Sequence, residues 1–410
     1  MTDPPTRQAT PPAVLAPGAL AGTPAAVLAA LPGSRAVGGA VRDTLAGRPV
    51  HDVDIAVPLP PEAVAERLRA AGLKVFETGL AHGTLTAVLN HQPVEVTSLR
   101  RDLTTDGRHA EVAWTTDWRE DAARRDFTIN AMSMTADGRL WDYFGGEADL
   151  AAGKVRFVGD PATRLAEDYL RALRFFRFQA RYGRGVPDAA ALAAIRDAVP
   201  GLARLSAERL WMELKRLLAA PDPGDAVALM AEAGVLAAVL PEAQTQDALR
   251  RLLRLAAPND ALLRLAALLP PEANHQALAH RLKLSGAETA RLAWLVDQSA
   301  MPPPDAGNTD MLVWRAMARF ADPPDALGPL WLADARDGRD RSGPRGMITG
   351  AAPAFPLQGR DALAAGLSPG PEIGRLLAAT RSWWLEQGCT PDHAACLEHL
   401  RELAAAPPTC

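Results

Sequence analysis

The sequence predicts an α+β protein, in which a small mixed-sheet head is followed by an all-α neck, body and tail. Two observations predict this. Short β-rich runs alternate with helical stretches from Ser34 to about Val158, and after Asp160-Pro161 amphipathic helical periods rich in Ala, Leu and Arg take over. A chain of 410 residues is long enough for two to four domains. We expect a disordered Pro-rich leader, a head, a neck and a body with tail, over residues 1–22, 23–160, 161–245 and 246–410.

Composition limits the classes of function. The net charge of −4 argues against a diffuse polycation, so any nucleic-acid contact must come from local Lys and Arg patches. The three cysteines, Cys389, Cys396 and Cys410, lack metal-ligand spacing and suggest reduced thiols. No apolar run approaches the roughly 20 residues that span a bilayer, and the leader has no signal-peptide pattern. We therefore expect a cytoplasmic protein without a membrane partner.

The head begins with a short helix. Thr23-Pro24 is typical of an N-cap followed by proline at the first helical position, and the helix should run to about Leu31. A second helix is expected over 62–71. The predicted strands are 52–57, 73–76, 84–89, 93–98 and 111–115.

The part after Asp160-Pro161 should be helical to the C-terminus, with looser Pro- and Gly-rich stretches near 300–308 and 337–358. The amphipathic helices predicted first are 163–182, 187–198, 206–219, 224–237 and 246–256.

Two carboxylates mark the candidate chemistry of the head. Asp52 and Asp54 are two residues apart in a predicted strand, so their side chains should point to the same side and repel each other unless a cation lies between them. Carboxylates suit Mg²⁺, which is usually bound by one or two of them together with substrate phosphates. The preceding Gly38-Gly39 allows a sharp turn into a helix whose N-terminus can approach a phosphate.

This order of motifs carries a resemblance. Val37-Gly38-Gly39-Ala40-Val41-Arg42-Asp43, followed by Asp-x-Asp, resembles the nucleotidyltransferases of the DNA-polymerase-β type, and within them the class II tRNA nucleotidyltransferase and poly(A) polymerase family. The resemblance implies a polymerase-β-like head, nucleotide binding by Gly38, Gly39 and Arg42, and Mg²⁺ held by Asp52 and Asp54. It also matches Glu95 to a third catalytic acid, for which an acidic residue on an edge strand is the alternative.

A second match is Arg124-Arg125-Asp126-Phe127-Thr128-Ile129-Asn130-Ala131. In the family this segment binds the ribose and triphosphate of the incoming nucleotide, which implies these roles for Arg125, Asp126 and Asn130. Guanidinium groups pair with phosphate oxygens, and Asp and Asn can hold ribose hydroxyls.

The segment Glu167-Asp168-Tyr169-Leu170-Arg171 bears on the choice of base. In a continuous helix Asp168 and Arg171 are three apart and share a face. The acceptor carboxylate and the donor guanidinium match the amine and the unprotonated ring nitrogen of cytosine and adenine, but oppose uracil and guanine. The pair could thus select CTP and ATP without a template, with Glu167 holding the arginine. The alternative is a surface ion pair between Asp168 and Arg171.

Arginines continue along the same predicted helix. Arg174, Arg177 and Arg181 follow Arg171 at spacings of three, three and four, which places them on one face. This stripe could bind the triphosphate or the phosphates of the acceptor strand. A solvated basic face is the alternative, for Arg181 in particular.

The resemblance extends from about residue 34 to near residue 400 and implies an enzyme that adds all or part of CCA to the tRNA 3′ end from CTP and ATP. One departure from the family's pattern lies between Arg101 and Val112, where this chain keeps Asp-Gly-Arg but lacks the Arg-Pro that follows it in the family's loop. An enzyme that adds only CC or only A, a poly(A) polymerase and a non-catalytic tRNA-binding protein therefore remain as alternatives.

Overall fold

The computed structural model describes residues 7–8, 21–79, 83–105, 110–299, 316, 327–339, 342, 345 and 353–405. These residues belong to two compact units, Met1–Pro241 and Glu242–Cys410. Most of the leader predicted for 1–22 lies outside the described residues. Arg7–Gln8 nevertheless form a short strand, β1, so the expectation of disorder does not hold for these two residues.

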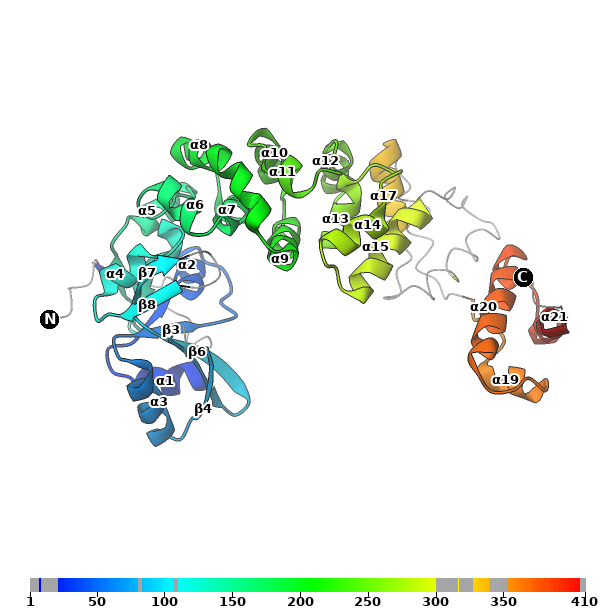
Figure 1. The fold of residues 1–410 in the computed structure, drawn as a ribbon, viewed down its shortest axis with the longest axis horizontal. Helices are drawn as coiled ribbons and strands as arrows, with labels where there is room; N and C mark the ends of the chain where they lie inside the picture. Colours follow the sequence, from blue (N-terminus) through cyan, green and yellow to red (C-terminus); the bar gives the residue numbers. More distant parts are fainter. Residues whose placement is uncertain are drawn as a thin grey trace. The chain divides into compact units, whose positions relative to one another are not determined.

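The head is built on one mixed sheet of eight strands (Figure 1). In spatial order the strands are β1 (Arg7–Gln8), β10 (Arg139–Asp142), β9 (Met132–Met134), β2 (Arg35–Val37), β3 (Asp54–Val57), β6 (Gln92–Ser98), β5 (Thr84–Leu89) and β4 (Lys74–Gly79). The β3–β6 pair is parallel and the other neighbours are antiparallel. A separate hairpin consists of β7 (Arg100–Thr105) and β8 (Ala110–Trp114), where only a strand over 111–115 was predicted.

Short helices join and cover these strands. They are α1 (Thr23–Ala30), α2 (Gly39–Leu45), α3 (Pro61–Ala70), α4 (Trp118–Ala123), the 3₁₀ turn η2 (Thr128–Asn130) and α5 (Gly146–Ala152). Helices α1 and α3 pack on β5 and β6 (Figure 1). The predicted helices at 23–31 and 62–71 are therefore confirmed to within a residue at each end.

The neck continues the first unit as helices only. Its elements are α6 (Pro161–Glu167), α7 (Leu170–Tyr182), α8 (Ala189–Ala198), η3 (Val199–Arg204), α9 (Ala207–Leu218), α10 (Gly224–Glu232) and α11 (Val235–Val239). Two predicted helices are divided. The helix expected over 163–182 breaks at Asp168, and that over 224–237 breaks at Gly234, whose φ of 79° suits glycine.

Buried aromatic rings join the head to α7. Phe127 of the head lies 4.8 Å from Phe157 and 5.2 Å from Phe178, measured between ring centroids. Phe157 also stacks against Phe175. Aromatic pairs of this kind contribute about 0.5–1.5 kcal/mol beyond their buried area. They fix the side of α7 that faces the head, and with it the arginines of that helix.

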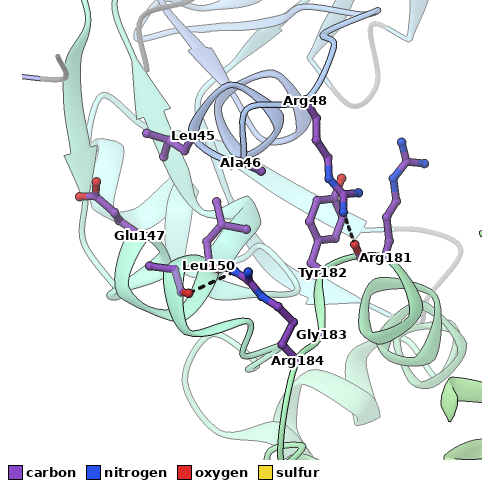
Figure 2. A pocket seen from close by; sticks show the side chains of 10 residues that line it. Leu45, Ala46, Arg48, Glu147, Leu150, Arg181, Tyr182, Gly183 and Arg184 are labelled. Carbon is purple, nitrogen blue, oxygen red and sulfur yellow. Dashed lines mark hydrogen bonds between the residues drawn. The ribbon is translucent and has the colours of Figure 1, made fainter. Parts of the chain in front are cut away.

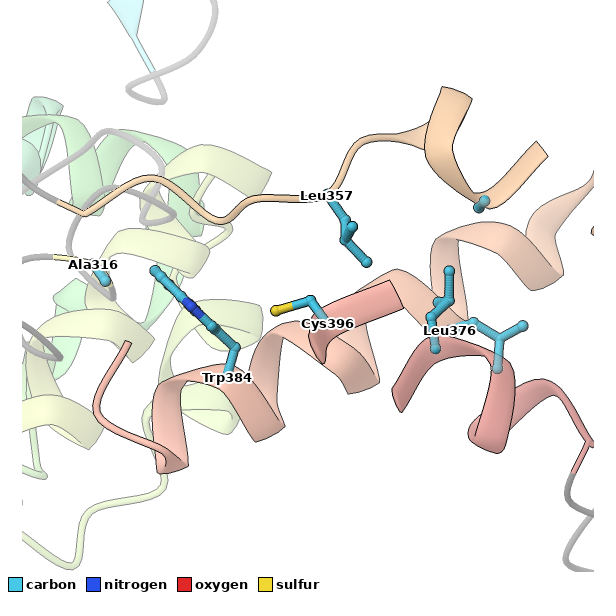
Figure 3. Close-up of a cluster of buried hydrophobic side chains, with 7 residues drawn as sticks. Ala316, Leu357, Leu376, Trp384 and Cys396 are labelled. Carbon is cyan, nitrogen blue, oxygen red and sulfur yellow. The ribbon is translucent and has the colours of Figure 1, made fainter. Parts of the chain in front are cut away.

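The second unit is helical throughout its described part. Its helices are α12 (Asp247–Arg254), α13 (Ala261–Leu268), α14 (His275–Arg281), α15 (Gly286–Ser299), α17 (Gly328–Asp337), α19 (Gly359–Ala364), α20 (Pro371–Glu386) and α21 (His393–Ala405). Leu376 and Trp384 of α20 pack with Cys396 of α21 and with Leu357 (Figure 3). None of the described helices has the length and hydropathy needed to cross a membrane.

Candidate active site

Three carboxylates border one cavity of the head. It has a volume of about 490 Å³, and its lining includes Asp52, Asp54 and Glu95 but no Lys or Arg. Asp54 is the first residue of β3, whereas Asp52 precedes the strand. The prediction of one strand over 52–57 is thus wrong at its beginning, and strand alternation does not account for the position of Asp52.

Pairing of β3 with β6 brings Glu95 beside Asp54. The strands are parallel and Ile55 lies opposite Val96. Asp54 and Glu95 each come one residue earlier, so they are neighbours on one face of the sheet. Loss of hydration at the cavity wall raises the pKa of Asp54 most, and the charges of Glu95 and Asp52 raise it further, whereas Arg125 opposes them. The cluster therefore favours an added cation.

The carboxylates do not form a finished metal cage. Within the described residues, no group of three or more His, Cys, Asp or Glu side chains already surrounds a position for a metal ion. Oxygen ligands from Asp52 and Asp54 alone suit Mg²⁺, which keeps several waters and takes further ligands from substrate phosphates. The donor set fits such an ion.

A second cavity, of about 600 Å³, shares Asp54 with the first. All ten residues predicted to bind nucleotide line it: Gly38, Gly39, Arg42, Arg125, Asp126, Asn130, Asp168, Arg171, Arg174 and Arg177. The lining also contains residues to which the sequence analysis gave no role: Arg100, Arg124, Leu170, Phe178 and Arg209. In total eight arginines and three aspartates line it, which favours a polyanionic ligand.

The Gly38-Gly39 turn brings α2 to the wall of this cavity. Gly38 has a φ of 62°, and a Cβ at this position would lie 3.2 Å from Nη1 of Arg125, so glycine serves both the conformation and the close approach. From α2, Nη1 of Arg42 donates a hydrogen bond to Oδ1 of Asn130 at 2.5 Å. The two predicted segments therefore meet directly.

Asp126 connects the head to α7. Its Oδ2 accepts a hydrogen bond from Nε of Arg174 at 2.7 Å, and its Oδ1 accepts one from Nδ2 of Asn130 at 2.9 Å. Burial alone would raise the pKa of Asp126, but the charge of Arg174 and these hydrogen bonds outweigh it and hold the pKa below its ordinary value. Asp126 is therefore a carboxylate that keeps Arg174 in place.

Other cavity arginines are also held by carboxylates behind them. Asp121 precedes Arg124 by three residues and Arg125 by four, and it forms ion pairs with both, at 2.8 and 3.1 Å. Glu213 of α9 is 1% exposed and pairs with Nε of Arg177 at 2.7 Å. Desolvation nevertheless lowers the pKa of Arg177 to about 10. Helical spacing alone could have revealed the role of Asp121.

The chain leaves helical geometry at the predicted base reader. Asp168 has φ −156° and ψ 106°, between α6 and α7, so the premise that Asp168 and Arg171 share a helical face is wrong. The two residues line the same cavity, and the backbone N–H of Arg171 donates to the carbonyl of Asp168 at 3.0 Å, but their side chains do not pair with each other in the described structure. The alternative, a surface ion pair between Asp168 and Arg171, is therefore wrong as well.

Each of these two residues has its own partner. Arg171 pairs with Glu167, as predicted, and its Nη1 also donates to the Arg164 carbonyl at 2.9 Å. Asp168 accepts a hydrogen bond from Nη2 of Arg209 at 2.7 Å. Arg209 lies on α9, 41 residues further along the chain, and no local periodicity could have indicated this contact.

The arginine stripe of α7 divides between two places. Arg171, Arg174 and Arg177 line the cavity that contains Asp54, whereas Arg181 lines a different one. The expectation of one continuous face therefore holds for the first three arginines only.

Comparisons with known proteins agree with this geometry. A family described as the poly A polymerase head domain matches residues 34–156, and one described as a probable RNA and SrmB-binding site of polymerase A matches 187–246. The mitochondrial CCA tRNA nucleotidyltransferase 1 of Danio rerio is 37% identical over 372 residues, which cover 85% of this chain and 83% of the relative. Its human counterpart is 35% identical, with 90% and 86% covered.

The chain belongs to the CCA tRNA nucleotidyltransferase family. Among solved structures, the CCA-adding enzyme of Bacillus stearothermophilus in complex with CTP is similar with a TM-score of 0.60, 28% identity and coverage of 90% of this chain and 93% of that one. The fold of the Thermotoga maritima CCA-adding enzyme complexed with tRNA is also similar, with a TM-score of 0.58, 21% identity, and 90% and 91% covered. The protein is thus a nucleotidyltransferase, and the predicted α+β architecture of a CCA tRNA nucleotidyltransferase is confirmed.

Proposed function

We propose that this nucleotidyltransferase adds nucleotides to the 3′ end of tRNA from CTP and ATP, with release of pyrophosphate. The observation that carries the proposal is the place of Asp54, which borders both a carboxylate cavity and an arginine cavity. A metal-bound nucleoside triphosphate needs such a pair of surfaces, because its cation and its phosphates must be held side by side.

The carboxylates supply the metal side. Asp52 and Asp54 would hold Mg²⁺, and Glu95 adds negative charge beside Asp54. When bound there, Mg²⁺ supplies activation of the primer hydroxyl and stabilisation of the pyrophosphate leaving group. The chain's own part is to keep these carboxylates together at the start of β3 and on its neighbour β6.

The arginines supply the phosphate side. Arg42, Arg125, Arg174 and Arg177 would orient the triphosphate, with the backbone at Gly38-Gly39 close to it. Asp126 and Asn130 would position the ribose. Because carboxylate or amide partners already hold these arginines, little side-chain entropy is lost when phosphate binds.

Base selection would rest on Asp168 and Arg171. The carboxylate accepts from the exocyclic amine of cytosine or adenine, and the guanidinium donates to the neighbouring ring nitrogen. Glu167 fixes Arg171. Arg209 and the Leu170 N–H each donate to one oxygen of Asp168, and the remaining lone pairs of this carboxylate can accept a further hydrogen bond. The reader is thus assembled from the α6–α7 break and α9.

The acceptor end of tRNA would be bound largely by the helical part of the chain. The RNA-binding family match at 187–246 supports this, and structured RNA is recognised mainly by shape and phosphate contacts. The protein should therefore lose tRNA affinity as salt rises.

One assay tests the proposal. The protein is incubated with tRNA transcripts that end at the discriminator base, at C and at CC, with CTP and ATP supplied separately and together, and product lengths are resolved. Stepwise addition that stops after CCA is the expected result. Addition of only CC or only A would identify a partial enzyme, and an unlimited A tail would identify a poly(A) polymerase. No incorporation in the presence of Mg²⁺ would contradict the proposal.

A further inference from the structure

A third cavity of the first unit contains arginines that the reaction described above does not use. It has a volume of about 400 Å³ and lies where the end of α2, helix α5 and the end of α7 come together (Figure 2). Its lining consists of Leu45, Ala46, Arg48, Glu147, Leu150, Ala151, Arg181, Tyr182, Gly183 and Arg184. Three guanidinium groups and one carboxylate therefore border it.

Backbone carbonyls and an aromatic ring hold two of these arginines in place. Nη2 of Arg48 donates to the carbonyl of Arg181 at 2.6 Å, and the Arg48 guanidinium lies 4.5 Å from the centre of the Tyr182 ring. Nη2 of Arg184 donates to the carbonyl of Ala151 at 3.2 Å. Figure 2 shows Arg48 and Arg184 entering the cavity from opposite sides.

None of the three has a carboxylate partner within the described part of the chain. This differs from the catalytic cavity, where Arg125, Arg171, Arg174 and Arg177 each form an ion pair. Carbonyl contacts orient a guanidinium without neutralising its charge. The cavity formed by Arg48, Arg181 and Arg184 therefore carries positive charge that no ion pair in the described structure neutralises, and two of its guanidinium groups are held in place, as suits recognition of an anion.

The cavity is connected to the catalytic one by a short chain of contacts. The hydroxyl of Tyr182 donates to Asp43, and Asp43 pairs with Arg42 at 3.1 Å. Arg42 lines the catalytic cavity. Arg181 belongs to α7, the helix whose earlier arginines face that cavity. The two cavities therefore lie on adjoining parts of the same helices, α2 and α7.

We propose that Arg48, Arg181 and Arg184 bind a backbone phosphate of the RNA substrate, at a site separate from the incoming nucleotide. This inference rests on the proposed function. A phosphodiester carries a single negative charge, which Glu147 at the wall tolerates better than the several charges of a triphosphate. The triphosphate in turn has its own arginines beside Asp54.

The test compares Arg181→Gln with the wild-type protein. Arg181 is exposed and its side chain makes no ion pair in the described structure, so the variant should keep its melting temperature. Binding of a tRNA transcript that ends at the discriminator base is measured without nucleotide over a range of salt concentrations. We expect about fivefold weaker binding, as for a partly exposed ion pair, and a salt slope reduced by about one. The KM for tRNA should rise and the KM for CTP should stay unchanged.

Two further variants keep the test specific. Arg48→Gln should act in the same direction as Arg181→Gln, with folding followed by thermal melting. Arg67→Gln on α3 is the matched control, since it removes one exposed positive charge from the same unit outside the cavity. Equal effects of Arg67→Gln and Arg181→Gln, or a rise in the KM for CTP alone, would overturn the inference and leave the proposed function standing. A wild-type protein that neither binds nor extends tRNA would overturn both.

Discussion

The two cavities that meet at Asp54 have opposite charge. One has Asp52, Asp54 and Glu95 in its wall and no Lys or Arg, whereas eight arginines line the other. On the acidic side loss of hydration raises the pKa of Asp54 most, and the like charges of Glu95 and Asp52 raise it further. On the basic side carboxylates lie behind the arginines, and the pKa of Asp126 is lowered.

The fold therefore prepares the two cavities in different ways. The acidic side is electrostatically incomplete and gains from a cation that must come from solution. The basic side is internally paired, so its arginines are already oriented when a nucleotide arrives. The two sides share Asp54, the first residue of β3, which the pairing with β6 aligns with Glu95. The following variants change the charges of the two cavities separately.

Glu213→Gln should have the largest effect on the basic side. Its carboxylate is buried and pairs with Arg177 at 2.7 Å. Removing one partner of a buried pair leaves the other charge uncompensated, and we expect a loss of about 3 kcal/mol in the free energy of unfolding. Urea unfolding measures this. Arg216→Gln, which removes a more exposed partner of the same carboxylate, is the control and should cost under about 1 kcal/mol. Equal losses would show that Glu213 does not organise the arginines.

Asp168→Ala should change the choice of nucleotide and leave metal dependence intact. The amine of cytosine or adenine loses its charged acceptor, which typically costs about 1.5–3 kcal/mol, or roughly ten- to a hundredfold in discrimination. Relative incorporation of all four nucleotides measures the change, and UTP or GTP should gain. Thr163→Ala on α6 is a control near this segment, since the Thr163 hydroxyl donates to Asp160 and to no residue of the cavity in the described structure. Unchanged selectivity of Asp168→Ala would remove Asp168 from base reading.

The two sides should respond to pH in opposite senses. The pKa of Asp126 is lower in the folded protein than in the unfolded chain. The ionised carboxylate therefore stabilises the fold above the ordinary carboxyl pKa, and this stabilisation is lost as the pH falls through the pKa of the folded state. Asp126→Asn should therefore cost about 1–2 kcal/mol at pH 7 and progressively less in acid. The pKa of Asp54 is raised in the folded protein. Its contribution to the free energy of unfolding is therefore present in acid and is lost as the pH rises through the pKa of the folded state. Without divalent ions, Asp54→Asn should leave stability unchanged in acid and raise it at pH 7.

Urea unfolding of both variants from pH 3 to pH 7, with EDTA present, makes this comparison. Changes of the same sign in the two variants at pH 7 would contradict the assigned difference between the cavities.

Much of the fold and the composition of the arginine-lined cavity could be predicted, because both follow from neighbouring residues in the sequence. The alternation of β-rich runs and helices located the head, and the segments Gly38–Asp43 and Arg124–Ala131 indicated residues that do line one cavity. Glu167 and Arg171 pair at a helical spacing, as expected. The functional roles given to these residues remain predictions that the variants above test.

The predictions from the sequence were wrong where a side chain competes with the helix for a backbone N–H group, or where the deciding contact joins residues far apart in the sequence. The Asp168 carboxylate accepts a hydrogen bond from the backbone N–H of Leu170 at 3.1 Å, which favours a break that hydrophobic periodicity does not reveal. Its bond from Arg209 spans 41 residues. Likewise, β3 begins only at Asp54, where pairing with Val37 of β2 starts. Such contacts depend on the tertiary fold.

The requirement for a cation at Asp54 is tested most directly by Asp54→Asn, assayed for CTP binding and for CTP incorporation into tRNA, each with and without Mg²⁺. The two cavities predict that the variant affects CTP binding and CTP incorporation differently. The arginine cavity should still bind CTP, but the gain in CTP affinity on adding Mg²⁺ should vanish, and incorporation should fall below detection. Incorporation at the wild-type rate by a correctly folded Asp54→Asn would contradict the account.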